Sequence, residues 1–300
     1  MKDFDYSIFL DLIKKYIPKD QYSLSYKDTY ETFWINNLAP AKVIFISAGT
    51  IKLIWNLSYI YNTFYENFLA GVSPSTPHID INNPNLMLLL AERRDYISTF
   101  LKQPQINNPL IQPIDQKINP RNQPFVEKTH YWVTNEITKY ALWFMALHEY
   151  SHILADKYHF SFTPPEYEET WCDNKAFSLY NEKVKTLAKK QDLLCAKMGL
   201  QIALTSMNAY SISIKNFGTS HEKTYLRIIN TMQPISEDDD DYWCLALSVL
   251  FFEAYLLGIQ PSPRPPFETY QKTYNNFKEV VVRWVDLFKD NEADICLASS

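Results

Sequence analysis

The stretch ALHEYSHILAD, residues 146–156, carries two histidines four positions apart, with a glutamate directly after the first. On a helix, residues i and i+4 project from the same face one turn apart. His148 and His152 can therefore present two imidazoles to one metal ion, while Glu149 is rotated by about 100° and lies beside that ion. From there Glu149 can take a proton from a water molecule, which is the physical reason for this spacing in zinc hydrolases.

The surroundings of this stretch favour a metal site over an ordinary helix that happens to carry polar side chains. Residues 141–155, ALWFMALHEYSHILA, are apolar on nearly all sides, so we expect the helix to be buried. A charged glutamate between two histidines is costly to bury unless a cation organises the group. The sequence therefore predicts bound zinc, with Glu149 as the catalytic base.

A catalytic zinc site needs a third protein ligand and an open position for water. His159 lies seven residues after His152, a spacing that does not suit a third histidine ligand, so we expect a surface or partly buried side chain there. In the next predicted helix, only Glu169 has a second acid four residues further on, Asp173. We expect Glu169 to be the third ligand and Asp173 to orient a ligating imidazole.

Two further acids, Glu166 and Glu168, stand near the start of the same helix. Acidic side chains there interact favourably with the positive end of the helix dipole, and we expect these two to do only that. If the helix begins near Pro165, Glu168 points about 100° away from Glu169, so only Glu166 competes with Glu169 for the metal.

The combination of HExxH with ExxxD on a following helix resembles the gluzincin group of metallopeptidases. The stretch TSHEKTYLRII, residues 219–229, is similar to an element of the prenyl-endopeptidase and heat-shock membrane-protease families. The resemblance implies a zincin-like core, with His221 and Arg227 placed beside the zinc and the scissile carbonyl. Glu222 stands where those families have proline. The membrane spans of the prenyl-endopeptidases have no counterpart in this sequence. Its order of motifs is similar to that of the soluble Lit phage-exclusion peptidases.

The hydrophobic pattern is mainly helical. It predicts helices over 5–17, 56–69, 85–101, 135–158, 162–184, 241–257 and 274–291. Residues 41–55, AKVIFISAGTIKLIW, have a β-rich run on each side of SAG, which predicts a hairpin that either packs in the core or offers an edge strand to a substrate. We therefore expect an α+β fold, mostly α-helical, in which an HExxH helix, a second ligand helix and a small hairpin or sheet form the core.

We expect residues 1–300 to form a single metallopeptidase domain. Prolines and asparagines are frequent in residues 72–84 and 102–125, on both sides of the helix predicted over 85–101, which predicts ordered loops or an insertion at about 72–125. Residues 242–259 are a mostly apolar run that contains Glu253, and its length and charge favour a buried core helix over a membrane span.

The composition excludes several classes of protein. There are 29 basic and 34 acidic residues without a basic block, which argues against a nucleic-acid partner. The five glycines are too scattered for a phosphate-binding loop. The four cysteines form no CxxC pair, and the N-terminal helix does not read as a secretory signal, so we expect a cytoplasmic protein.

Together these patterns predict a zinc-dependent endopeptidase that hydrolyses peptide bonds in a cytoplasmic protein substrate, with defence or stress as its setting. Two alternatives stay open. One is a zinc-binding regulatory or immunity protein that does not cleave, although a purely structural site has no use for Glu149 as a base. The other is a membrane-associated interaction protein, which only residues 242–259 support. The sequence specifies neither the substrate nor the oligomeric state.

Overall fold

The computed structural model describes residues 23–27, 35–38, 43–66, 83–91, 130–163 and 166–213, with the single residues Lys272 and Asn275. The chain divides into two compact units, of which the first comprises Met1–Asn62 and Asp95–Ile235 and the second Thr63–Arg94 and Ser236–Ser300. In the second unit, residues 84–91 form a helix, as predicted for the start of 85–101, and bury Leu86, Leu89 and Leu90. The single domain over 1–300 stays a prediction.

The first unit contains a three-stranded sheet with the order β1-β3-β2. The strands are β1 (Ser23–Lys27), β2 (Ile35–Leu38) and β3 (Val43–Ser47). β3 pairs in parallel with β1 and antiparallel with β2, and it buries Ile44 and Ile46 completely. Because β3 is paired on both sides, the prediction that residues 41–55 offer an edge strand to a substrate is wrong.

The hairpin predicted within residues 41–55 is also wrong, because helix α2 (Ala48–Phe64) begins directly after β3. Ser47 caps this helix: the backbone N–H of Thr50 donates to Ser47 Oγ over 3.0 Å, and the two hydroxyl oxygens lie 2.9 Å apart. The segment SAGT is therefore a helix start and not a turn. A hairpin does exist one segment earlier, where β2 and β3 pair with Leu38 opposite Val43.

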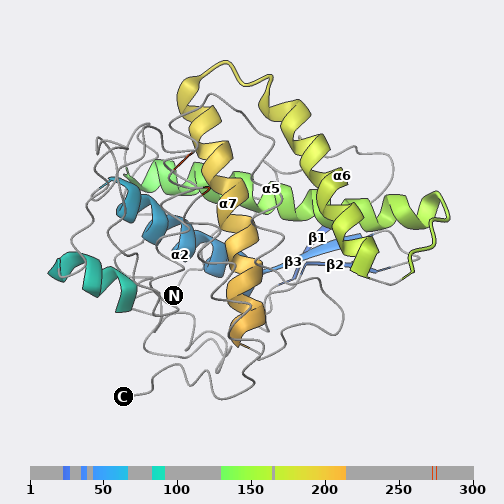
Figure 1. Cartoon of the computed structure of the whole chain (residues 1–300), viewed down its shortest axis with the longest axis horizontal. Coiled ribbons are helices and arrows are strands. Elements are labelled where there is room, and N and C mark those ends of the chain that lie inside the picture. The colour runs from blue at the N-terminus through green and yellow to red at the C-terminus, as the bar shows by residue number, and fades with distance from the viewer. Residues whose placement is uncertain are drawn as a thin grey trace. The chain divides into compact units, whose positions relative to one another are not determined.

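Three long helices complete the described part of the first unit, namely α5 (His130–Lys157), α6 (Glu166–Val184) and α7 (Lys190–Ser213) (Figure 1). The helices predicted over 135–158 and 162–184 are confirmed as α5 and α6, whereas α7 was not predicted. Helix α5 packs against both of the others. At Gly199 of α7, an added Cβ would lie 2.6 Å from Tyr140 Cβ and 2.8 Å from the carbonyl oxygen of Ile137. Only glycine therefore permits this close approach of α7 to α5.

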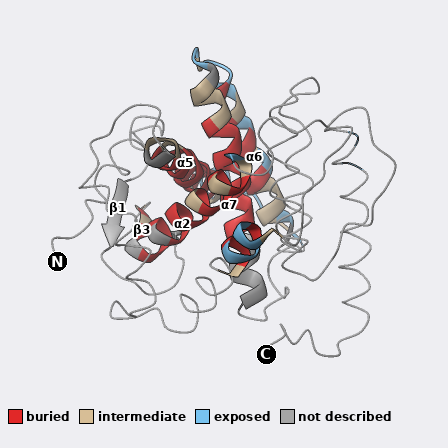
Figure 2. Ribbon diagram, turned by 90° about the vertical axis from the view of Figure 1, so that its left-hand side faces the viewer, coloured by how far each residue is buried: buried red, intermediate tan, exposed pale blue. Residues whose placement is uncertain are grey.

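Helix α5 is buried along most of its length (Figure 2). The ring of Tyr180, from α6, lies 4.5 Å from that of Trp143 and 5.7 Å from that of Phe144, measured between centroids. The Tyr180 hydroxyl donates to the carbonyl of Ala196 on α7 over 2.7 Å. Trp55 Nε1 of α2 donates to Asn135 Oδ1 of α5, also over 2.7 Å. These directional contacts fix the position of α5 between its neighbours.

The C-terminal half of α5 also packs on the sheet. Ile44 of β3 forms one buried cluster with three residues of α5, and two residues of α6 pack against that cluster. The residues of the helices are Tyr150, Ile153, Leu154, Trp171 and Leu179. One apolar face of the HExxH segment is thus anchored, which directs its polar face toward the start of α6.

Several predictions concern residues outside the described ranges, namely the helices over 5–17 and 241–257, the helix over 274–291 apart from Asn275, the run 242–259 and the motif at 219–229. Among the helices that the structure does describe, none combines the length and apolar character needed to cross a bilayer.

Candidate metal centre

His148 and His152 occupy successive turns of α5 and project from the same face, as their spacing predicts. Their Nε2 atoms lie 3.3 Å apart, and their rings meet edge to face with centroids 5.0 Å apart. His148 is buried and His152 is half-buried. The two nitrogens therefore converge on one point at the α5 surface.

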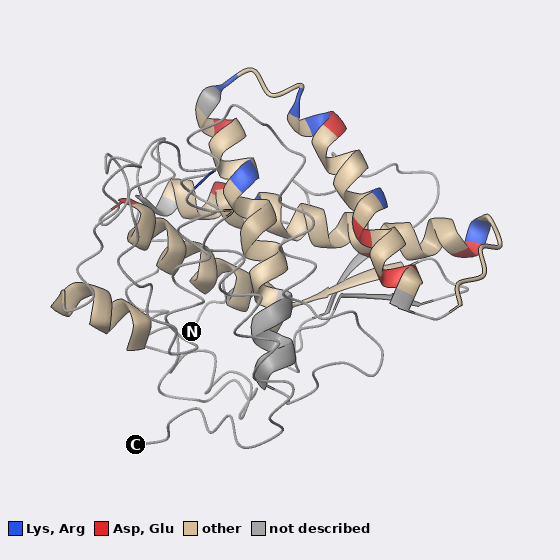
Figure 3. Ribbon diagram, viewed as in Figure 1, with Lys and Arg blue, Asp and Glu red and all other residues tan. Residues whose placement is uncertain are grey.

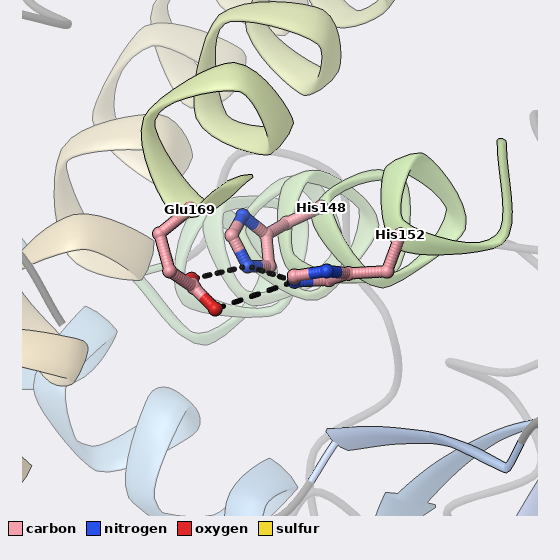
Figure 4. A group of neighbouring side chains, drawn as sticks. All are labelled: His148, His152 and Glu169. Atoms are coloured by element: carbon pink, nitrogen blue, oxygen red, sulfur yellow. Dashed lines mark hydrogen bonds and ion pairs between the residues drawn. The ribbon is translucent and has the colours of Figure 1, made fainter. Parts of the chain in front are cut away.

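Glu169 reaches the same point from the first turn of α6 (Figure 4). Its Oε2 atom lies 3.3 Å from His148 Nε2, and its Oε1 atom lies 3.5 Å from His152 Nε2. The structure thus brings together the three side chains that the sequence analysis singled out as ligands, and their donor atoms form a group that could hold a metal ion.

Asp173 holds the far side of the His148 ring. Its Oδ1 atom lies 2.9 Å from His148 Nδ1, and both side chains are buried. An ionised carboxylate can only accept a hydrogen bond, so Nδ1 carries the proton and donates it. The unprotonated Nε2 of His148 then faces Glu169 with its lone pair, which is the orientation that metal binding requires.

Glu168 holds His152 in the same way, which the sequence analysis did not predict. Its Oε1 atom lies 2.8 Å from His152 Nδ1, so this carboxylate does more than interact with the helix dipole. The rotation of about 100° from Glu169 directs Glu168 to the outer edge of the same imidazole and not away from the site. No spacing within α6 reveals this contact, because it depends on how α6 crosses α5.

The geometry of the three inner ligands fits zinc. With zinc–nitrogen and zinc–oxygen bonds of about 2.0–2.2 Å, two ligand atoms of a tetrahedral site lie about 3.3–3.6 Å apart. The three separations here are 3.3, 3.3 and 3.5 Å. Since both Nδ1 atoms carry protons, three lone-pair donors face one another at this distance. Such a group is repulsive unless a cation or additional protons lie between its members.

Negative charge is concentrated around these ligands, and Figure 3 marks the acidic residues along α6. Burial raises the pKa of the Cys172 thiol, and four nearby carboxylates raise it further. These carboxylates belong to Glu169, Glu168, Asp173 and Glu149. Glu149 therefore lies close enough to the centre to share its electrostatic field, and a divalent cation would reduce the mutual repulsion of all four.

His159 follows the end of α5 at Lys157 and is exposed, so the expectation of a surface or partly buried side chain there is confirmed. Its φ of 54° lies in the left-handed region. The N–H of Phe160 donates to the carbonyl of Ala155, and that of His159 donates to the carbonyl of Asp156, both over 3.1 Å. This is the Schellman arrangement of a helix C-terminus, with histidine at the position that glycine usually occupies.

The remaining predicted site residues are not placed by the structure. His221 and Arg227 lie outside the described residues, as does the side chain of Glu166.

A comparison with curated proteins found no match, and neither did a comparison with solved structures. The family model described as peptidase U49 matches residues 44–251. The match covers more than half of the chain and includes α5 and α6 with every residue of the centre described above. The predicted peptidase character is thereby confirmed, and the chain belongs to the peptidase U49 family.

Proposed function

We propose that this peptidase is a zinc-dependent endopeptidase whose metal ligands are His148, His152 and Glu169. One observation carries the proposal, namely that three donor groups converge at the separations of a tetrahedral zinc site. Three protein ligands leave a position open for water, as in catalytic zinc sites and unlike structural ones.

When bound, zinc polarises the scissile carbonyl and lowers the pKa of a water molecule toward neutrality. Asp173 and Glu168 keep the two imidazoles in the tautomer that presents Nε2. Glu149 is half-buried and follows His148 directly, so its carboxylate lies beside the ligands and not among them. It accepts a proton from the attacking water and delivers it to the leaving amine, a role typically worth about 10²–10⁴ in rate.

The resemblance at residues 219–229 extends the proposal to the developing oxyanion, which His221 and Arg227 would stabilise. We also propose one metallopeptidase domain over 1–300, since the family match runs across segments of both compact units. A cytoplasmic protein substrate is favoured by two buried cysteines that are free, Cys172 and Cys195. The alternative of a zinc protein without proteolysis is disfavoured by Glu149 and by membership of a peptidase family.

The test combines metal analysis with hydrolysis. Purified protein should contain about one zinc per chain. The variants His148→Ala, His152→Ala and Glu169→Gln should lose it, because each removes one ligand. Glu149→Gln should keep the zinc and the fold but lose hydrolysis, since an amide cannot accept the proton.

Hydrolysis can be followed without a known substrate by comparing new protein N-termini in cells that express wild type or Glu149→Gln. Glu182→Gln, an exposed glutamate near the end of α6, is the matched control and should behave as wild type. Full zinc in both histidine variants would place the metal elsewhere. Undiminished cleavage by Glu149→Gln would exclude this residue as the base.

A further inference from the structure

A second group of donor atoms shares His152 with the first. It consists of His152, Glu168 and Cys172, whose potential ligand atoms lie within 4.8 Å of one another. Glu168 Oε1 contacts Nδ1, whereas Glu169 Oε1 contacts Nε2, so the carboxylates of the two groups approach the same imidazole at opposite nitrogens. We propose that His152, Glu168 and Cys172 form a second metal site, selective for a soft divalent cation such as Cd²⁺.

The donor set determines which cation fits. Thiolates select soft metal ions, and imidazole suits the same ions, whereas magnesium and calcium require mainly oxygen ligands. The first group, with two imidazoles and a carboxylate, contains no sulfur. The two sites therefore differ in preference, and a soft cation is drawn to the one that contains Cys172.

Burial and charge around the sulfur support this assignment. Cys172 is fully buried, and four carboxylates lie within electrostatic range of its sulfur. A bare thiolate is costly in such a place, and a divalent cation removes that cost. The Glu168 side chain is 38 % exposed, so a cation in solvent can reach this carboxylate directly.

Binding requires two protons to move. The cation displaces the proton of the Cys172 thiol, which passes to solvent. It also takes the Nδ1 lone pair of His152, so the single ring proton moves from Nδ1 to Nε2. A neutral imidazole has one lone pair, and His152 then cannot serve the first site. On the proposed function, a soft cation in the second site therefore inhibits hydrolysis.

The experiment titrates Cd²⁺ into the full-length, zinc-loaded protein and follows the ultraviolet thiolate-to-cadmium charge-transfer absorption. Wild type should develop this band and release its zinc in parallel. Cys172→Ser should show no band, and Cys172→Ala provides a second variant if serine perturbs the buried position. Cys195→Ser is the matched control, since it removes a buried cysteine of α7, and it should keep the band. Glu168→Ala should weaken cadmium binding by roughly tenfold or more.

Two results would overturn the second site, namely no band in wild type or a band that persists in both Cys172 variants. His148→Ala separates this inference from the proposed function, because it removes a ligand of the first site alone and should keep the band. If wild type bound no zinc yet gave a band that depends on Cys172, the zinc proposal would fail and the second site would stand. If wild type bound zinc through His148 but gave no band, the zinc proposal would stand and the second site would fail.

Discussion

The hydrogen bonds from the two imidazoles to Asp173 and Glu168 should contribute unequally to zinc affinity. The perturbations are Asp173→Ala and Glu168→Ala. Each removes the acceptor that fixes one ligating ring in the tautomer with an unprotonated Nε2. The two bonds have nearly the same length, 2.9 and 2.8 Å, so geometry alone does not separate them.

Burial does separate them. The Asp173 side chain is 6 % exposed, whereas that of Glu168 is 38 % exposed. Water replaces and screens an exposed carboxylate far better than a buried one. We therefore expect Asp173→Ala to weaken zinc binding by about 10–100-fold, which corresponds to about 1.4–2.7 kcal/mol. Glu168→Ala should weaken it less, by roughly threefold to tenfold.

The assay is a competitive zinc titration of each variant against a chelator of known affinity. Asp173→Asn and Glu168→Gln should each lose less than the alanine variant, because an amide oxygen still accepts the Nδ1–H bond. Glu182→Ala, on the exposed part of α6, is the control. A larger loss in Glu168→Ala than in Asp173→Ala would refute the argument from burial. Affinities equal to that of the control in both variants would mean that these bonds do not hold the ligands.

Two other predictions concern the frame around the site. Gly199→Ala should lower the free energy of unfolding, measured with urea, by about 1–3 kcal/mol, because the new Cβ would lie 2.6 Å from that of Tyr140. If this variant were as stable as wild type, α5 and α7 would not approach so closely. His159→Gly should raise stability by up to about 1 kcal/mol, since glycine adopts the positive φ at less cost, and should leave the zinc content unchanged. Loss of zinc in His159→Gly would instead identify His159 as a ligand.

Geometry that one helix alone sets can be predicted from the sequence. His148 and His152 share a face of α5 because they are four residues apart, and the same spacing relates Glu169 to Asp173 on α6. Local spacing does not determine which of two adjacent glutamates meets which ring. That depends on how α5 and α6 cross, so the role of Glu168 could not be predicted.

The misread elements have related causes. Ile51, Leu53 and Ile54 are apolar and buried, and two of them are β-branched, a composition that a strand and a buried helix turn share. The Ser47 cap decides for the helix. Helix α7 escaped prediction because its middle is buried almost all round, with even Lys197 and Gln201 inside. Hydrophobic periodicity detects helices that have one solvent-exposed face. A helix that is covered on every side shows no such period.

Helix α5 supplies His148 and His152, and α6 supplies Glu168, Glu169 and Asp173, each set at a fixed spacing along its helix. The centre therefore depends on a single relation, the packing of α6 on α5. That relation is set by Tyr180 against Trp143 and by the cluster around Ile44, at positions away from the ligands. Under the proposed zinc binding, the ion would in turn join the two helices. An ion that binds only the folded chain adds about 4 kcal/mol of stability at a free concentration 1,000 times its Kd. Metal affinity is therefore coupled to packing contacts far from the ligands. A substitution that weakens the packing of the Tyr180 ring should weaken zinc binding, and removal of zinc should lower the melting temperature of this unit.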